Sequence, residues 1–168
     1  FLILLLGIIS IFAMYSTERG NFDYYTKSHI YRFFAFFLIF IFLSFFNIRI
    51  FYKSAYIFYF VTLLLLFGVS MFGVTASGSQ RWINLYVFNL QPSELMKVAL
   101  IIFLARFYNK IPFKDVNHIK FMIMPIFALF IPFALVLKQP DLGTAGLILV
   151  SGLCIVWLSG FRIKFFAF

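Results

Sequence analysis

The chain has 168 residues, 64% of them hydrophobic and 11% charged, with a mean hydropathy of +1.05. A soluble domain of this size could not enclose so many apolar side chains in one core, so the composition indicates an integral membrane protein. The net charge of +9 would suit a nucleic-acid-binding protein, but the basic residues fall singly between apolar runs. Membrane topology explains them better, and no nucleic-acid partner is expected.

Six apolar segments follow one another along the chain, most of them near the roughly 20 residues that a helix needs to cross a bilayer. They cover residues 1–15, 29–47, 54–73, 92–108, 119–137 and 142–160. The sequence therefore predicts an all-α, polytopic membrane helix bundle that forms a single transmembrane domain over residues 1–168. Neither end reads as a natural terminus, so we expect a piece of a longer protein or the product of an interrupted gene.

Lysine and arginine are distributed unequally between the two sides of such a bundle. The loops after the second, fourth and sixth helices carry eight cations and the single acid Asp115. These cations are Arg49, Lys53, Arg106, Lys110, Lys114, Lys120, Arg162 and Lys164. The opposite side carries six cations and four acids. Because cytoplasmic loops are enriched in lysine and arginine, the first set should be cytoplasmic, which leaves residues 78–97 and 138–144 together on the outer face.

The stretch QPSELMK, residues 91–97, begins the fourth helix. Pro92 suits the first helical position, which makes Gln91 the N-cap. Glu94 at the third position can reach back to the N-cap N–H as half of a capping box, and Lys97 follows on the same face. Capping alone would explain Glu94. It explains Lys97 less well, because a lysine about 7 Å inside the helix start would be costly in free energy if it faced lipid. A polar cavity would lower that cost.

The stretch KQPDLGT, residues 138–144, repeats this arrangement before the sixth helix. Lys138 ends one helix, Pro140 favours an extended conformation for Gln139, and Asp141 begins the first turn of the next helix. A helix cap followed by small residues that let helices pack closely is the alternative interpretation. Two such polar entrances facing the same water would together form a site.

Arg81 lies in the loop before the fourth helix, and its planar guanidinium suits bidentate recognition of phosphate. Alone it would be read as a solvated loop cation, but Arg81 and Lys97 together favour an anionic ligand at the outer leaflet. Glu94 and Asp141 could also pair for acid–base chemistry or metal binding, an alternative that stays open because the sequence gives no distance between them. We therefore assign no catalytic residue and no metal ligand. No cofactor is evident, and the requirement for a divalent cation is left open.

Three segments of the sequence resemble the SEDS family of bacterial envelope proteins, and RodA more than FtsW. They are GSQRWINL, QPSELMKVALIIFLARFY and QPDLGTA followed by a small-residue helix. The resemblance implies a peptidoglycan glycosyltransferase of the bacterial inner, cytoplasmic membrane. Such enzymes polymerise lipid II, a disaccharide-pentapeptide carried on undecaprenyl diphosphate, among membrane lipids and beside a class B penicillin-binding protein. RodA acts in cell elongation and rod-shape maintenance, and FtsW acts in cell division.

A lipid diphosphate suits the outer polar residues of this chain. The cations expected to hold it are Arg81, Lys97 and Lys138. Glu94 would orient Lys97, while Gln139 and Asp141 would shape the outer cavity. The family fold is expected to have about ten transmembrane helices, with its catalytic aspartate in a later outer loop that this chain does not reach. Asp141 should not inherit that role, and these residues alone are expected to be inactive.

Two alternatives to a glycosyltransferase remain. The first is a lipid II flippase, for which the outer cations would form one end of a translocation path. Flipping needs a polar route through the bilayer, and the fifth and sixth helices have no charged residue near their middles. The second is a noncatalytic scaffold of the elongation machinery.

Overall fold

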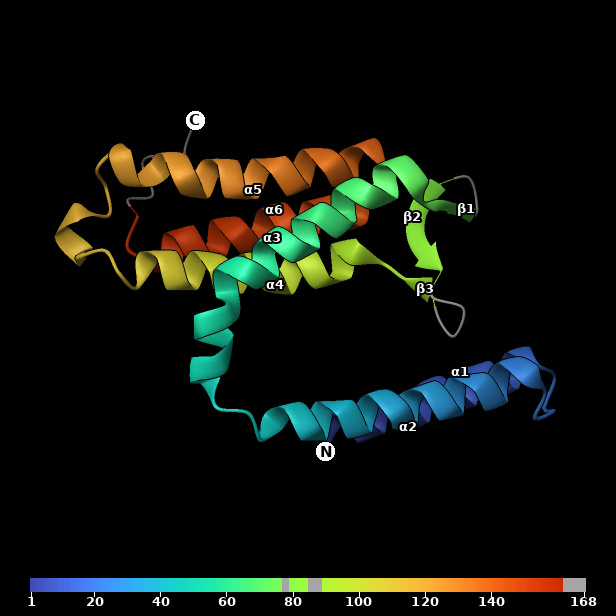
Figure 1. The fold of residues 1–168 in the computed structure, drawn as a ribbon. Coiled ribbons are helices and arrows are strands. Elements are labelled where there is room, and N and C mark those ends of the chain that lie inside the picture. Colours follow the sequence, from blue (N-terminus) through green and yellow to red (C-terminus); the bar gives the residue numbers. More distant parts are fainter. Residues whose placement is uncertain (77–78, 85–88, 162–168) are drawn as a thin grey trace. The chain divides into compact units, whose positions relative to one another are not determined.

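The computed structural model describes residues 1–161 apart from 77–78 and 85–88. Its internal contacts divide the chain into two compact units, Phe1–Asn47 and Ile48–Phe168. The elements of the first unit are α1 (Leu2–Thr17) and α2 (Tyr24–Ser44). The helices of the second unit are α3 (Ile48–Phe72), α4 (Pro92–Tyr108), η1 (Phe113–Asp115), α5 (Lys120–Lys138) and α6 (Leu142–Leu158). All six predicted helices are present (Figure 1).

In the first unit, a carboxylate in the turn after α1 holds the start of α2. Glu18 accepts hydrogen bonds from the N–H groups of Tyr25 and Thr26, each at 3.0 Å. Hydrogen bonding by Thr26 lowers the pKa of Glu18. The two helices also meet where Ser10 Oγ lies 2.9 Å from His29 Nε2.

Two of the predicted helix starts were placed too late. Helix α2 begins at Tyr24 rather than residue 29, and α3 begins at Ile48 rather than residue 54. The sequence-based bounds followed the apolar runs, whereas a helix continues past the hydrocarbon wherever its first N–H groups find partners. In α2 the Glu18 carboxylate supplies them.

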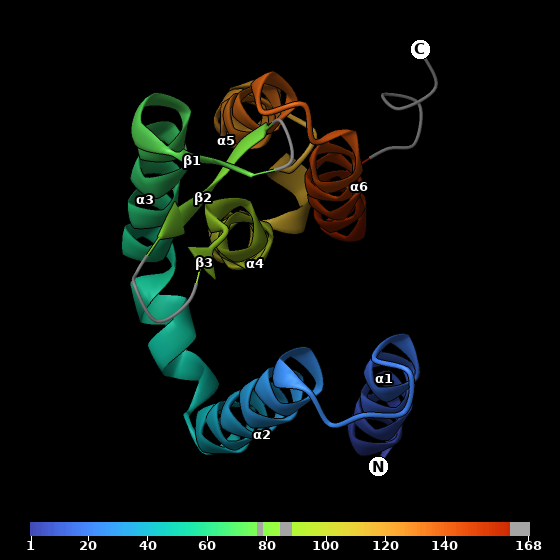
Figure 2. The same cartoon turned by 90° about the vertical axis from the view of Figure 1, so that its right-hand side faces the viewer.

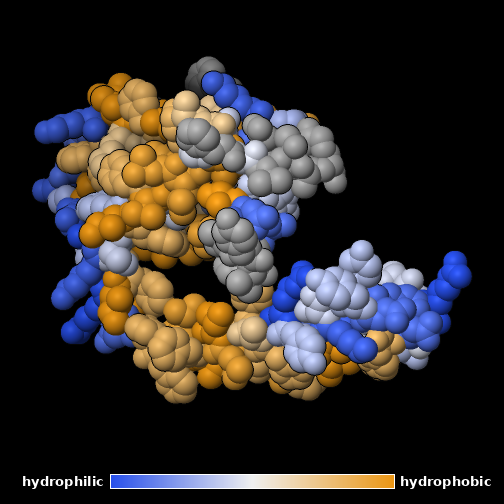
Figure 3. Space-filling view, turned by 45° about the vertical axis from the view of Figure 1, so that its right-hand side comes forward, coloured by the Kyte–Doolittle hydropathy of each residue, from blue (hydrophilic) through white to orange (hydrophobic). Residues whose placement is uncertain are grey.

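In the second unit, α3 to α6 run alternately up and down, so α4, α5 and α6 join through turns at alternate ends (Figure 1). Helix α4 packs against both α3 and α6, and α5 packs against α6. Helices α2, α3 and α5 are long and apolar enough to cross a membrane, and α1 and α6 are shorter apolar helices. Large apolar side chains cover much of the outer helix surfaces, as a lipid-facing surface requires (Figure 3).

The chain forms a small antiparallel sheet after α3 and before α4, which the sequence did not predict. Its strands are β1 (Val74–Ala76), β2 (Ser79–Asn84) and β3 (Asn89–Leu90), in the order β1-β2-β3. Ile83 pairs with Leu90, and Thr75 pairs with Gln80. The strands lie across the ends of the helices (Figure 2). Strands this short show no alternation of apolar and polar residues long enough to be recognised in the sequence.

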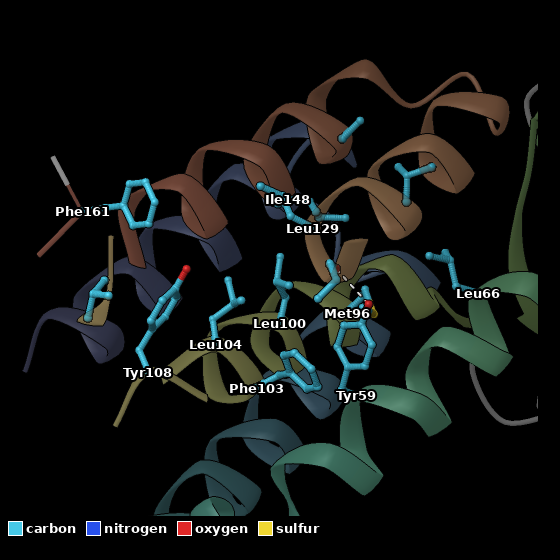
Figure 4. Close-up of a cluster of buried hydrophobic side chains, with 14 residues drawn as sticks. Tyr59, Leu66, Met96, Leu100, Phe103, Leu104, Tyr108, Leu129, Ile148 and Phe161 are labelled. Carbon is cyan, nitrogen blue, oxygen red and sulfur yellow. Dashed lines mark hydrogen bonds between the residues drawn. The ribbon is translucent and has the colours of Figure 1, made fainter. Parts of the chain in front are cut away.

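The core of this unit joins all four helices (Figure 4). Phe103 of α4 is 1% exposed, and its ring lies 4.4 Å from that of Tyr59 on α3, centroid to centroid. Met96 is fully buried, and its sulfur accepts a hydrogen bond from the Thr62 hydroxyl at 3.3 Å. Because α4 contributes Met96, Leu100, Phe103 and Leu104 to this core, its register is fixed against α3 and α6, and so is the direction of its polar first turn.

Tyr59 also completes the backbone of α5. Pro132 lies inside that helix and lacks the N–H that would bind the carbonyl of Ala128, four residues earlier. The Tyr59 hydroxyl donates to this carbonyl at 2.8 Å. A carbonyl left free by proline is thus satisfied by a neighbouring helix, as an apolar surrounding demands.

We expect Tyr59→Phe to lower the free energy of unfolding by about 1 kcal/mol, because the Ala128 carbonyl loses its donor. The measurement is reversible unfolding of the whole protein in mixed micelles with increasing dodecyl sulfate. Tyr56→Phe is the matched control, since Tyr56 lies one turn away and makes its described contacts through its ring. Equal losses in the two variants would refute the assignment.

Candidate functional site

Arg81 of β2 ties the sheet to the turn between α5 and α6. Its Nε donates to the Gln139 carbonyl at 3.0 Å, and its Nη2 donates to the Pro140 carbonyl at 2.5 Å. Nη1 lies 3.6 Å from Asp141 Oδ2. The arginine is therefore engaged within the protein, although 28% of its side chain stays exposed.

Asp141 caps α6 and links it to the start of α4. Its Oδ1 accepts from the Thr144 N–H at 3.1 Å, and its Oδ2 accepts from the Thr144 hydroxyl at 2.8 Å. Oδ2 also accepts from Gln91 Nε2 at 3.2 Å. The two stretches that share the dipeptide Gln-Pro, QPSELMK and QPDLGT, are thus joined by a direct hydrogen bond.

The surroundings of Asp141 keep it ionised. Partial burial by itself would raise the pKa of this carboxyl, but the two Thr144 hydrogen bonds and the positive charges of Arg81 and Lys97 outweigh it. The net effect lowers the pKa of Asp141 below its ordinary value of 3.8. Lys97 therefore lies within electrostatic reach of Asp141 as well as of its own partner.

That partner is Glu94, whose Oε1 accepts from Lys97 Nζ at 2.8 Å. The predicted contact between the two is present. Only 22% of the Lys97 side chain is exposed, against 56% for Glu94. Gln91 is the N-cap and Pro92 begins α4, as predicted, but the expected capping box is replaced: Glu94 binds Lys97, and the Gln91 amide binds Asp141.

Gln139 and Lys138 are adjacent, but Gln139 is buried and Lys138 is exposed. Gln139 is 5% exposed, and its amide donates to the Leu66 carbonyl and to Ser70 Oγ of α3, both at 3.4 Å. Lys138 ends α5 with an exposed side chain. The prediction that Pro140 holds Gln139 extended was wrong. Gln139 has φ −88° and ψ 23°, because its N–H closes the last turn of α5 on Val136 at 3.0 Å and its amide binds α3.

The structure thus brings all six predicted site residues to one end of the second unit. Five of them form the hydrogen bonds and ion pairs described above, and Lys138 adjoins Gln139 at the end of α5. We name this group the outer polar cluster; it consists of Arg81, Gln91, Glu94, Lys97, Lys138, Gln139, Asp141 and Thr144. Sequence reasoning named Gln91 only as a helix cap and missed its bond to Asp141. The repeated Gln-Pro dipeptide was the available signal. Nothing in the sequence indicated that Leu66 and Ser70 would hold Gln139.

The cluster contains both cations and carboxylates. Among the residues that the structure describes, no group of three or more His, Cys, Asp or Glu could hold a metal ion. Its two carboxylates have separate partners, Lys97 for Glu94 and Thr144 with Arg81 for Asp141. The arrangement suits recognition of an anion by a positioned ammonium group better than it suits a paired-carboxylate centre.

The family model described as cell cycle protein, FtsW/RodA/SpoVE, matches residues 1–168. The chain belongs to this family. The resemblance seen in the three sequence segments is therefore confirmed, and the chain is a multi-pass membrane protein of the SEDS type.

Family members with names and structures support the same placement. MrdB of Escherichia coli K12, named a peptidoglycan glycosyltransferase, is 39% identical over 104 residues, which make up 61% of this chain and 27% of MrdB. A chain from a peptidoglycan synthase complex, in a study of coordinated polymerization and crosslinking, superposes with a TM-score of 0.77 at 26% identity. That match covers 94% of this chain and 47% of the other.

The crystal structure of the rod-shape-determining protein RodA from Thermus thermophilus gives a TM-score of 0.65 at 28% identity. It covers 75% of this chain and 41% of that RodA chain. The predicted helical membrane fold is confirmed by these neighbours. In each of the three comparisons the matched region is less than half the length of the relative.

Proposed function

We propose that this chain forms the lipid-diphosphate-binding part of a peptidoglycan glycosyltransferase that polymerises lipid II, in the elongation role of RodA rather than the division role of FtsW. The observation that carries the proposal is the joining of the two motif helices at one polar end, in a chain whose relatives include named peptidoglycan glycosyltransferases. The matched region is less than half the length of these relatives, and we expect these residues alone to be inactive.

The outer polar cluster suits a diphosphate headgroup. It presents three cations against two carboxylates, with the apolar surfaces of the helices beside it for a lipid tail. Lys97 is the cation best placed to bind, because Glu94 orients it and its ammonium has donors to spare. Arg81 acts mainly by positioning, since its guanidinium fixes the turn that carries Asp141. Exposed Lys138 would add charge at the rim.

The proposed location is the inner membrane, with the outer polar cluster on the external side. The opposite end of the second unit bears Arg49, Lys53, Arg106 and Lys110, the cation-rich side that the positive-inside rule places in the cytoplasm. Arg162 and Lys164, which were counted with this side, lie outside the described residues. A class B penicillin-binding protein is the proposed partner, because one structural relative belongs to a complex that couples polymerization to crosslinking.

A lipid II flippase is the competing function. Among the residues that the structure describes, the buried polar residues of the second unit are the uncharged Thr62, Ser93, Gln139 and Thr144. None of the buried residues described there is a charged one that could line a path for a diphosphate. This favours polymerisation at the surface over transport through the bundle.

The experiment that separates the two uses the whole protein with its partner in liposomes that contain fluorescent lipid II. Polymerase activity is expected to convert external lipid II into glycan strands. The strands are separated on gels, with crosslinking of their pentapeptides blocked. Movement of lipid II across the bilayer without strands would support the flippase instead. Neither activity, in a sample that still binds its partner, would favour the scaffold.

A further inference from the structure

A groove opens between α3 and α4 at the end of the second unit opposite the outer polar cluster. Its volume is about 650 Å³. We call it the α3–α4 groove; it is lined by Ile48, Arg49, Phe51, Tyr52, Ile101, Ile102, Ala105, Arg106 and Asn109. Five of these nine residues are aliphatic or phenyl side chains, and two are arginines. The wall is thus apolar along most of its length and cationic where the helices leave the membrane.

Arg106 is held against the wall by aromatic rings. Its guanidinium carbon lies 4.3 Å from the ring centroid of Tyr56 and 5.1 Å from that of Tyr52. One of its amino groups, Nη1, donates to the Lys53 carbonyl at 2.7 Å. Its Nε is buried and has no hydrogen-bond partner among the described residues. Stacking therefore fixes the plane of the guanidinium, whose five N–H donors exceed the one hydrogen bond described for it.

The charge around this groove is of one sign. Arg49 and Arg106 line it, and Lys110 lies close by with its Nζ 5.7 Å from the Tyr56 ring centroid. None of the lining residues is acidic. A planar guanidinium with free donors beside a second arginine is a favourable environment for a phosphate oxygen.

We propose that the α3–α4 groove binds an anionic glycerophospholipid, with its phosphate on Arg49 and Arg106 and an acyl chain along Phe51, Ile101 and Ile102. A soluble phosphate would gain nothing from the apolar wall, whereas a lipid satisfies both parts of the groove. Basic pockets between membrane helices on the cytoplasmic side are known to bind anionic headgroups of this kind. The inference does not depend on the proposed substrate, because the outer polar cluster lies at the other end of the unit.

The test is native mass spectrometry of the whole protein, titrated in detergent with phosphatidylglycerol or with phosphatidylcholine of the same acyl chains. We expect the first phosphatidylglycerol to bind more tightly than phosphatidylcholine, and Arg49→Gln with Arg106→Gln to weaken it about 25-fold, or about fivefold per cation removed. Lys114→Gln with Lys120→Gln is the matched control. It removes the same charge from exposed positions outside the groove and should change binding less than twofold.

Two further variants test the groove without altering Arg106, whose replacement could disturb folding. Arg49→Gln alone keeps the stacked arginine and should weaken binding about fivefold. Ile102→Trp fills the apolar part of the groove without altering charge, and it should also weaken the first lipid. Equal losses in the control pair, or equal affinity for the two lipids, would overturn the proposal.

Discussion

Replacing Lys97 by alanine should lower lipid II polymerisation by the whole protein with its partner at least tenfold, equivalent to about 1.4 kcal/mol in the barrier. Lys97 lies on the polar side of α4, paired with Glu94 at 2.8 Å and within electrostatic reach of Asp141. Its ammonium is thus held where an anionic headgroup can approach. Alanine removes the charge while the buried residues of α4 keep the helix in place, so the loss should appear in catalysis and not in folding.

The kinetic constants distinguish binding from a purely structural role. If Lys97 holds the diphosphate, KM for lipid II should rise and Lys97→Arg should restore part of the activity, because it restores the charge. Lys114→Ala, an exposed lysine at the opposite end of the second unit, is the matched control and should leave turnover unchanged. An unchanged kcat/KM in Lys97→Ala would show that Lys97 only neutralises Glu94 at the start of α4.

Replacing Asp141 by alanine should lower the free energy of unfolding by about 2 kcal/mol. The change removes the N-cap of α6, which by itself stabilises by about 1 kcal/mol, and it also removes the acceptor for the Thr144 hydroxyl, Gln91 and Arg81. Asp141→Asn keeps an oxygen for the cap but loses the charge, so it should cost about half as much. Unfolding of the whole protein in mixed micelles gives both values.

Two comparisons test the cause of that loss. Asp115→Ala, which removes a carboxylate from the turn region between α4 and α5, should have a much smaller effect. The pH dependence follows from the lowered pKa of Asp141: its contribution is complete above the ordinary value of 3.8 and disappears only as pH falls through the lower folded value. Wild type and Asp141→Asn should therefore differ at neutral pH and converge in strong acid. If the difference in the free energy of unfolding stayed constant down to low pH, the charge of Asp141 would not be the source of the stabilisation.

The helices and their polar starts could be predicted because their causes are local. A run of apolar residues long enough to cross a bilayer, preceded by Gln91-Pro92, specifies a helix and its first position without knowledge of any neighbour. The N-cap at Gln91 and the Glu94–Lys97 pair follow from spacing along one helix, and both are present. Family membership also rests on such short segments, which is why the sequence was enough to identify it.

The contacts that assemble the cluster depend on residues far apart in the chain, and only tertiary structure decided them. Arg81 binds Gln139 across 58 positions, and Gln139 binds Leu66 across 73. Packing of α4 against α3 and α6 determines which side chains reach each other, and the same contacts override the extended preference of a residue before proline. The sequence by itself determined the helices, their charged ends and the family. The fold determined that Arg81 holds the turn between α5 and α6, which leaves Lys97 as the cation proposed to bind the anionic headgroup. The reason is that a hydrogen bond forms only between groups that the packed helices bring within about 3 Å.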